Sequence, residues 1–386
     1  MNSFWLGRRV LVLSSSYPGS SEDGRAWFVH EGARALAEAG AEVLVCTPAW
    51  RGTARREVIR DVRVERFGYM GRRILPIAGE HGIPENLRAH PARALTVPSF
   101  LAGFIAATRR LVARFRPQTL IGHWLLPTAL AVRGCGLPAL LLAHGSDVRW
   151  LATMPGGRKL GAYLTRGSAV IPTSDALATT LERIGLVPRR TIPVGIRLPP
   201  LPELSRLTAR SGEEPARLCS FGRWVPGKGW PELLEAVAAS PRTHLTLGGF
   251  GPLEPFIRRR AAQIGPRVKV VGPVVGAEAK RHFFAEHDAF VFAGTRGARE
   301  DNLPVTVLES LAHGVPVVAT RVGALAEVIG QGEGWLVEPG TFELGERLSV
   351  LTRGQCRART RAARARAESR SWTRVIDQLA DVAASV

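Results

Sequence analysis

Cysteine is scarce in this chain of 386 residues, which contains only four. The four lie far apart, form no CxxC pair and join no Cys/His cluster with the spacing of metal ligands. The pattern therefore argues against a disulfide framework and against a structural zinc site. We expect reduced cysteines, as in a reducing cytoplasm, and no metal site.

Lysine is also rare, although the chain is strongly basic. Lysine and arginine together number 52 against 33 acidic residues, for a formal net charge of +19, yet lysine occurs only at positions 159, 228, 269 and 280. The arginine excess has two interpretations: a GC-rich genome, or an anionic partner such as a phosphorylated substrate, an acidic lipid surface or a nucleic acid. In either case a lysine is more informative than an arginine.

Aromatic residues and long apolar runs are few. Aromatics make up 7% of the chain and are not interleaved with basic residues, which argues against a nucleic-acid-binding surface. No apolar run reaches the ~20 residues of a membrane-spanning helix. The first apolar run, around Arg8 and Arg9, resembles a β-strand more than a signal peptide. We expect a cytoplasmic protein that contacts a membrane, if at all, from its inner face.

The remaining composition, 45% hydrophobic and 22% charged residues, is that of a globular protein long enough for two domains. Short apolar runs alternate with amphipathic helical patterns, which is typical of βαβ units and parallel sheets. The alternation breaks in a Pro-rich, charged stretch and then restarts. We predict an α/β protein of two doubly wound, Rossmann-like domains facing across a cleft. The predicted boundaries are residues 1–195, a linker at 196–215, residues 216–371, and a C-terminal helix at 372–386 that packs back on the first domain.

Two glycine-containing turns follow predicted strands in the second domain. In FGRWVPGKGW, Gly222 and Arg223 end a strand and Lys228 lies between two glycines before a helix. Two cations near a helix start suit a diphosphate, although they could be two solvated surface charges. In LGGFGPLEP, Gly249 and Gly251 could let a ligand approach the backbone closely, or could simply end a strand.

Two histidines and one loop glycine are candidates in the first domain. His144 directly follows the apolar run PALLLA, and His123 ends the run before it. Either could be an ordinary core histidine, but the Gly-Ser-Asp after His144 indicates a turn at the end of a strand. Gly24 belongs to a polar loop after the first strand, which could fold over a ligand or be plain surface.

The stretch REDNLPVTVLES predicts a helix whose first turn carries Pro304, where proline is tolerated. The amides of Asn302, Leu303 and Val305 would then form an anion site at the helix start. Glu309 follows within an apolar surround, where a carboxylate is costly without a partner. A ribose diol could supply that partner; the alternative is a solvated glutamate on the helix face.

An ordered series of motifs resembles the family 4 retaining glycosyltransferases, which have the GT-B fold and use nucleotide-sugar donors. The series runs through FVHEGARALAEAGAEVLVCTP, RPQTLIGHW, AHGSD, IPTSDAL, VGI, GRWVPGKG, GFGP and DNLPVTVLESLAHGVPVVAT to the closing SW. Each motif alone is weak, but their order across nearly the whole chain is specific. The resemblance implies transfer of a sugar to a glycan, lipid-linked or small-molecule acceptor, with no cofactor beyond the nucleotide sugar.

The resemblance also implies roles for individual donor-side residues. Asp301 matches the first acid of the family's paired-acid motif by its spacing to Glu309, although glutamate is usual there. Glu309 would hold the ribose, and Arg223 and Lys228 would neutralise the departing diphosphate. His144 would contact the donor sugar near the reacting carbon. Further donor-binding residues implied by the matching motifs are Gly222, Gly249, Gly251, Asn302, Leu303, Pro304 and Val305, with the amides of residues 302–305 on the distal phosphate.

On the acceptor side, Gly24 matches the second glycine of the family's acceptor loop, with Asp23 in place of the first, and His123 lies nearby in the pattern. The basic segment 72–93 is a further acceptor-side or membrane-side element. The helix predicted around residues 99–116 is either a core helix or an interfacial helix on anionic lipid.

Other functions remain open from the residues alone. A non-hydrolysing sugar-nucleotide epimerase uses the same fold. A glycogen-type phosphorylase would need a lysine-bound pyridoxal cofactor, for which none of the four lysines has an evident site. The net charge leaves a basic nucleic-acid-binding protein as the alternative of a different class.

Overall fold

In the computed structural model the chain forms two compact units. Unit 1 comprises Met1–Gly195 and Trp372–Val386, and unit 2 comprises Ile196–Ser371. The structure describes residues 3–20, 23–72, 75–79, 83–200, 212–295 and 303–386. Of the segment expected to link the domains, residues 196–200 and 212–215 belong to unit 2, and the remainder lies outside the described residues.

Unit 1 is built on a seven-stranded sheet in the order β3-β4-β2-β1-β5-β6-β7. Its strands are β1 (Arg9–Ser14), β2 (Glu42–Pro48), β3 (Arg56–Ile59), β4 (Val62–Phe67), β5 (Thr119–His123), β6 (Ala139–Ala143) and β7 (Ala169–Pro172). Neighbouring strands are parallel except for the β3–β4 hairpin at one edge. The hairpin was not predicted, although its alternating apolar residues around the Arg60–Asp61 turn, both at positive φ, are a hairpin signal.

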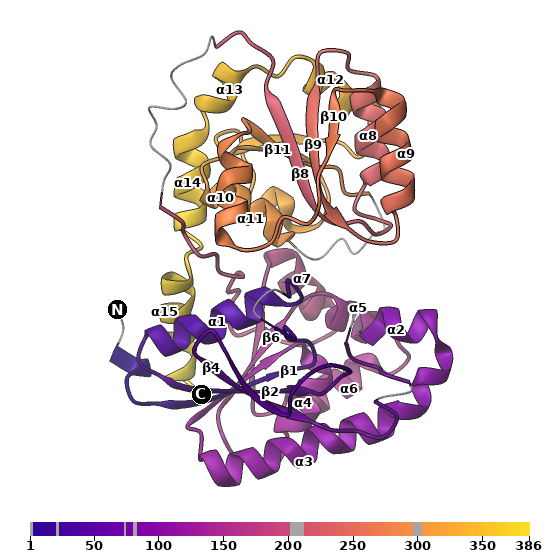
Figure 1. Ribbon diagram of the computed structural model, residues 1–386. Helices are drawn as coiled ribbons and strands as arrows, with labels where there is room; N and C mark the ends of the chain where they lie inside the picture. The colour runs from indigo at the N-terminus through magenta and orange to yellow at the C-terminus, as the bar shows by residue number, and fades with distance from the viewer. Residues whose placement is uncertain (1–2, 21–22, 73–74, 80–82, 201–211, 296–302) are drawn as a thin grey trace. The chain divides into compact units, whose positions relative to one another are not determined.

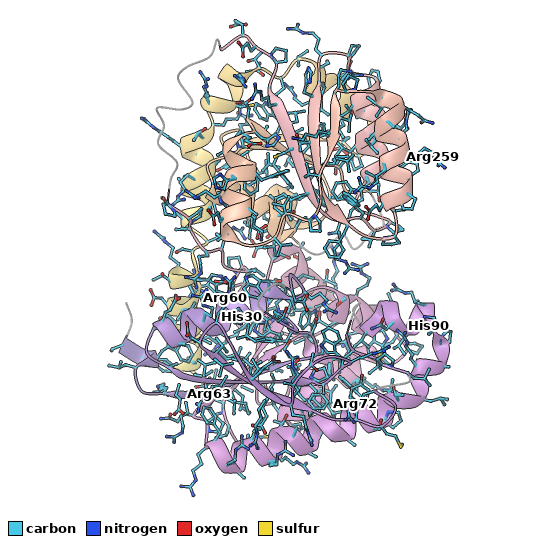
Figure 2. The ribbon with its side chains drawn as sticks, in the orientation of Figure 1. His30, Arg60, Arg63, Arg72, His90 and Arg259 are labelled. Atoms are coloured by element: carbon cyan, nitrogen blue, oxygen red, sulfur yellow. The ribbon has the colours of Figure 1, made fainter. Side chains whose placement is uncertain are left out.

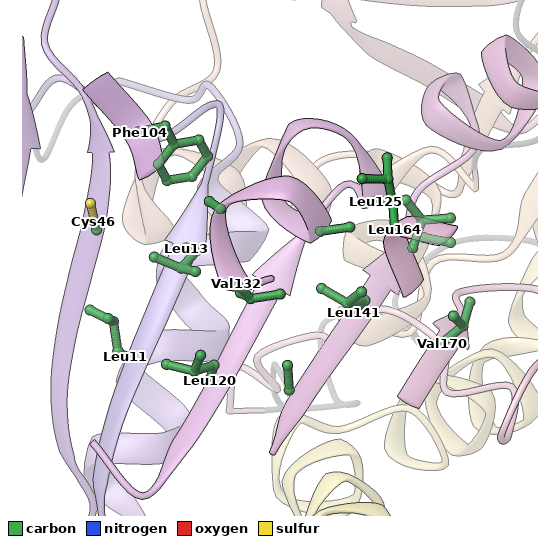
Figure 3. Close-up of a cluster of buried hydrophobic side chains, with 14 of the residues drawn as sticks. Leu11, Leu13, Cys46, Phe104, Leu120, Leu125, Val132, Leu141, Leu164 and Val170 are labelled. Atoms are coloured by element: carbon green, nitrogen blue, oxygen red, sulfur yellow. The ribbon is translucent and has the colours of Figure 1, made fainter. Parts of the chain in front are cut away.

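Helices cover both faces of this sheet (Figure 1). They are η1 (Ser3–Trp5), α1 (Trp27–Glu38), α2 (Ile83–Ala89), η2 (Pro91–Thr96), α3 (Val97–Phe115), α4 (Leu125–Val132), α5 (Ser146–Thr153), α6 (Gly157–Thr165), α7 (Asp175–Arg183) and α15 (Trp372–Ala383). Alternate residues of β1 supply the two cores, because successive side chains of a strand point to opposite faces. Leu11 and Leu13 pack with Phe104 in one core (Figure 3), and Val10 and Val12 pack in the other.

Helix α3 is a core helix of unit 1. Phe100, Phe104 and Leu111 are buried, whereas Arg109 and Arg110 are exposed. The stretch Pro91–Phe115 is long and apolar enough to cross a membrane by length and composition, with a mean hydropathy of 1.2. Core helices of globular proteins can be equally long and apolar, and here Phe100, Phe104 and Leu111 pack in the core of unit 1.

Helix α15 closes the first core from the far end of the chain. Val375, Ile376 and Leu379 are buried in the core that contains α1, and the indole Nε1 of Trp5 donates to the carbonyl of Ile376 at 3.0 Å. The ring of Trp372 lies so close to Gly195 that an added Cβ would come within 2.5 Å of it. The C-terminal helix is therefore an integral part of unit 1.

Unit 2 has a six-stranded, fully parallel sheet in the order β10-β9-β8-β11-β12-β13. Its strands are β8 (Arg217–Arg223), β9 (His244–Phe250), β10 (Val268–Val270), β11 (Ala289–Phe292), β12 (Val317–Thr320) and β13 (Gly334–Val337). Its helices are α8 (Trp230–Ala238), α9 (Glu254–Ile264), α10 (Ala277–Ala285), α11 (Val305–Ala312), η4 (Gly323–Glu327), α12 (Thr341–Ser349), α13 (Arg353–Arg357) and α14 (Thr360–Glu368). With two parallel sheets of this kind, the predicted α/β class is confirmed.

Candidate functional sites

The predicted diphosphate loop joins the central strand of unit 2 to a helix. Arg223 is the last residue of β8, and Gly229 caps the start of α8 with a φ of 73°. A Cβ on Gly229 would lie 1.6 Å from the carbonyl oxygen of Ala293, so only glycine lets the loop approach the end of β11 this closely. Lys228, directly before Gly229, is thus fixed at the carboxyl ends of two neighbouring parallel strands.

The ammonium group of Lys228 lies in an unfavourable electrostatic position. The residue as a whole is exposed, but its Nζ lies 5.5 Å from the centroid of the Phe292 ring. Burial of the ammonium group, followed by the positive charge of Arg223, lowers the pKa of Lys228. In the described part of the chain no carboxylate pairs with Lys228. The positive charges of Lys228 and Arg223 therefore repel each other at this loop, and an anion would relieve that repulsion.

Two of the three glycines assigned to the donor site, Gly249 and Gly251, lie too close to neighbouring backbone to carry a side chain. The φ of Gly249 is 147°, and a Cβ there would lie 2.1 Å from the carbonyl oxygen of Gly222. At Gly251 a Cβ would lie 2.6 Å from the carbonyl oxygen of Trp224. The close approach is thus between the ends of β8 and β9 themselves. Their use by a ligand stays a prediction.

Helix α11 begins at Val305, and Pro304 is its extended N-cap rather than a member of the first turn. The Val307 amide donates to the Pro304 carbonyl at 3.0 Å. The Val305 amide, at the first residue of the helix, is therefore the first backbone donor that a ligand at the helix start could meet. Leu303 precedes the cap and is half-buried. The predictions for Asp301 and Asn302 lie outside the described residues.

Glu309 has a protein partner that the sequence did not reveal. Its Oε1 lies 2.6 Å from Nζ of Lys280, in the first turn of α10. The side chain of Lys280 is only 22% exposed and that of Glu309 only 15%. The predicted need of this carboxylate for a partner is therefore met by an ion pair between two helices, 29 residues apart in sequence.

The two histidines of unit 1 form a buried pair at the ends of β5 and β6. Nδ1 of His123 lies 3.0 Å from Nε2 of His144, and the rings stack with centroids 5.2 Å apart. Burial lowers the pKa of His123 to about 3; burial and then the neighbouring His123 lower the pKa of His144 well below its usual value. Both rings are therefore neutral near pH 7, with one nitrogen donating to the other. Phe28 and Trp124 pack against them.

Asp147, which was not predicted as a site residue, holds the backbone around these histidines. Its carboxylate accepts from the amide of Leu125 at 2.5 Å and from the amide of His144 at 3.2 Å. Burial raises the pKa of Asp147, and these amide hydrogen bonds oppose that rise. Asp147 thereby ties the loop after β5 to the loop after β6. Its place in the HGSD motif, three residues after a strand-end histidine, is the signal that could have found it.

The loop that carries Gly24 is held by its neighbours and not by the glycine. The Asp23 carboxylate accepts from the Gly19 amide at 2.7 Å and from the guanidinium of Arg25 at 2.6 Å, and Arg25 lies 4.1 Å over the Trp50 ring. A Cβ on Gly24 would meet nothing within 4 Å. The structure thus gives no packing reason for a glycine at this position.

Basic side chains are spread over both units. Figure 2 shows Arg60 and Arg63 at the β3–β4 hairpin of unit 1 and Arg259 on α9 of unit 2. Within the described ranges, no three His, Cys, Asp or Glu side chains gather as metal ligands would. The expectation of a metal-independent reaction stays a prediction.

Comparison with known proteins places this arrangement in a class. A solved structure of sucrose-phosphate synthase from Thermosynechococcus elongatus aligns over 98% of this chain and 99% of that one, with a TM-score of 0.73 at 20% identity. That similarity defines the fold as GT-B, the two-domain fold of many glycosyltransferases.

The sequence matches identify the family. Residues 23–198 match the family described as Glycosyltransferase Family 4, and residues 215–351 match the one described as Glycosyl transferases group 1. The chain is 24% identical to TuaC of Bacillus subtilis, named for teichuronic acid biosynthesis, over 86% of this chain and 85% of that protein. It is 29% identical to a GDP-mannose-dependent phosphatidylinositol monomannoside mannosyltransferase of Mycolicibacterium smegmatis, over 78% of each chain. The chain belongs to the family 4 glycosyltransferases and is a hexosyltransferase-type enzyme, as predicted.

Proposed function

We propose that this enzyme transfers a sugar from a nucleoside-diphosphate sugar bound by unit 2. The observation that carries the proposal is the pair of cations at the β8–α8 loop, where burial and Arg223 lower the pKa of Lys228. A diphosphate would remove the repulsion between these two charges. The helix start at Val305 adds a backbone donor, and Glu309 offers a carboxylate for ribose hydroxyls.

The same charges would assist the reaction. Cleavage of the sugar–phosphate bond moves an electron pair onto the leaving diphosphate, so its negative charge grows toward the transition state. Fixed cations stabilise that growing charge more than they stabilise the bound donor, and this difference is what lowers the barrier. In this proposal Arg223 and Lys228 do the work for which other enzymes use a divalent metal. Retention of configuration would follow from attack on the face the diphosphate leaves.

The acceptor side is proposed to lie on unit 1, at the strand ends that carry His123 and His144 and at the loop around Gly24. A neutral histidine pair can donate to or accept from sugar hydroxyls without attracting the diphosphate. His144 would contact the transferred sugar, and the open space at Gly24 would admit an acceptor close to the backbone. The relatives named above act in glycan and glycolipid synthesis by their names, and a glycan or lipid-linked acceptor is proposed here on the same basis.

Donor binding is tested by thermal shift with UDP-, GDP- and ADP-sugars, because a ligand that binds only the folded state raises the melting temperature. We expect one base to stabilise the wild type, and Lys228→Met to lose most of that shift. Lys269→Met is the matched control, since Lys269 is an exposed lysine of the same unit on β10. No shift with any donor, or equal shifts in wild type and Lys228→Met, would contradict the proposal.

We also propose a peripheral contact with anionic membranes, from the cytoplasmic side. The exposed side of α3 carries Arg109, Arg110 and Arg114, the last two of which pair with Glu65. The large apolar side chains of the helix are buried or half-buried against the core, so the contact would be electrostatic and would not insert the helix. Co-sedimentation with phosphatidylglycerol-containing vesicles should be lost in high salt and in pure phosphatidylcholine. Equal binding to both vesicle types would contradict this proposal.

A further inference from the structure

The ion pair between Lys280 and Glu309 bears on how the donor site works. Lys280 lies in the first turn of α10 and Glu309 in the second turn of α11, and their charged atoms are 2.6 Å apart. Both side chains are largely shielded, at 22% and 15% exposure. A shielded pair with such a short contact holds its geometry better than a solvated surface pair, whose two long side chains move freely.

The surroundings of Glu309 explain why the carboxylate needs this lysine. Its neighbours Leu308, Ser310 and Leu311 are buried, so Glu309 emerges from an otherwise packed helix. An ionised carboxylate there, without a partner, would be costly, and it would repel a diphosphate bound nearby. Lys280 reduces both the cost of burial and the repulsion, because it neutralises the carboxylate. It also fixes the position of the carboxylate before any ligand binds.

The geometry leaves half of the carboxylate available. Lys280 occupies Oε1, and in the part of the chain that the structure describes no hydrogen-bond donor pairs with Oε2. Glu309 keeps 15% of its side-chain surface exposed, so a small donor group such as a sugar hydroxyl can reach it. A carboxylate held at one oxygen and open at the other is suited to select a hydroxyl at a defined place.

We infer that Lys280 is a positioning residue of the donor site, which orients Glu309 toward the ribose and balances its charge beside the diphosphate. The inference rests on the proposed function, since it assumes that a nucleoside diphosphate binds unit 2. A merely structural pair would join α10 to α11 and would weaken every ligand equally when broken. A positioning residue instead sets the preference for a nucleotide that has ribose hydroxyls over one that lacks them.

The test measures that preference by isothermal titration calorimetry with UDP, GDP and ADP and with their 2′,3′-dideoxy analogues. The wild type should bind the ribonucleotide of its preferred base about tenfold more tightly than the dideoxy analogue, as expected for hydrogen bonds to a charged acceptor. Lys280→Met should weaken both nucleotides, because the uncompensated carboxylate repels their diphosphate, and should in addition reduce this ratio to about twofold. Lys280→Arg should keep most of the preference, and Lys269→Met, the same change at an exposed lysine of β10, should keep all of it.

A double-mutant cycle separates positioning from direct contact. If Lys280 acts through Glu309, then Lys280→Met should add nothing to the loss caused by Glu309→Gln. Additive losses would show that Lys280 binds the nucleotide itself and would overturn the inference. An unchanged ribose preference in Lys280→Met, with wild-type binding intact, would overturn the inference alone. Failure of the wild type to bind any nucleotide would instead overturn the proposed donor site, and the inference with it.

Discussion

The candidate sites of the two units treat charge in opposite ways. In unit 1 the polar groups satisfy one another: His123 pairs with His144, both remain neutral, and the Asp147 carboxylate is taken up by backbone amides. In unit 2, burial and the positive charge of Arg223 lower the pKa of Lys228. These contacts in unit 1 are thus made without a ligand, whereas an anion would relieve the repulsion at the loop in unit 2.

This difference indicates where binding energy comes from in each unit. A group that is already satisfied gains little from a ligand, so the unit 1 site can only select by shape and by neutral hydrogen bonds. A group held in an unfavourable state gains when the ligand relieves it, and the gain grows with the negative charge of the ligand. The donor-side charges should therefore matter for rate, and the buried pairs of unit 1 for stability.

The largest effect should come from removing Lys228. Lys228→Met deletes a cation that stabilises the leaving diphosphate, and we expect kcat/KM for transfer to fall by about 10²–10³-fold. The unliganded protein should be as stable as the wild type or slightly more stable, because the repulsion with Arg223 disappears. Enzyme kinetics with the donor found by thermal shift, together with chemical denaturation, measure both quantities. If Lys228→Met keeps full activity, or loses activity only because it is unfolded, then Lys228 does not stabilise the leaving diphosphate.

The next effect should appear in unit 1, on stability. Asp147→Ala would leave the amides of Leu125 and His144 without their acceptor in a buried place, at a cost of about 2–4 kcal/mol in the free energy of unfolding. Asp147→Asn keeps one acceptor oxygen and should cost less. Hydrogen exchange measured by mass spectrometry should show faster exchange in peptides covering residues 119–150, with unit 2 peptides as the internal control. Unchanged protection of these peptides would show that the carboxylate does not hold the two loops.

The parts of these sites that were predictable are those contained in one local stretch. The β8 strand, the glycine turn with Lys228 and the start of α8 follow from adjacent residues, and the predicted strand ends at His123 and His144 are where β5 and β6 end. By contrast, the partner of Glu309 comes from a different helix, and nothing in the periodicity of either helix says which residues face each other. The hydrophobic pattern specifies elements, but the pairing of side chains between elements depends on their packing.

Acid should lower the folding stability of unit 1, because burial keeps the rings of His123 and His144 neutral in the folded state. An unfolded histidine binds a proton near pH 6.5, whereas burial holds the pKa of His123 at about 3 in the folded state. Between these values the unfolded chain binds a proton that the folded chain refuses, so stability is full above about pH 6.5 and falls as the pH is lowered toward 3. Each histidine should cost about 1.4 kcal/mol at pH 5.5 relative to neutral pH.

Denaturation at pH 7.5 and at pH 5.5 tests this, with His123→Gln compared to the wild type. The variant should lose less stability on acidification, because it no longer carries one of the groups that titrate on unfolding. Carboxylates and the histidines that do not contact His123 contribute equally to both proteins and cancel in the comparison. An equal loss in the two proteins would mean that the His123 ring is not held neutral by burial.

The smallest effect on stability should come from Gly24→Ala. Comparison with Gly249→Ala distinguishes a glycine that the fold requires from one that ligand binding requires. Gly24→Ala places its Cβ in open space and should change the free energy of unfolding by no more than about 0.5 kcal/mol. If an acceptor approaches this backbone, the variant should raise the KM for the acceptor while leaving the KM for the donor unchanged. Gly249→Ala would force a Cβ to 2.1 Å from the Gly222 carbonyl at a positive φ, and it should destabilise unit 2 before any effect on chemistry can be read. If instead Gly24→Ala destabilises the protein, the fold alone would explain both glycines. If it changes neither KM, the loop would lose its place on the acceptor side.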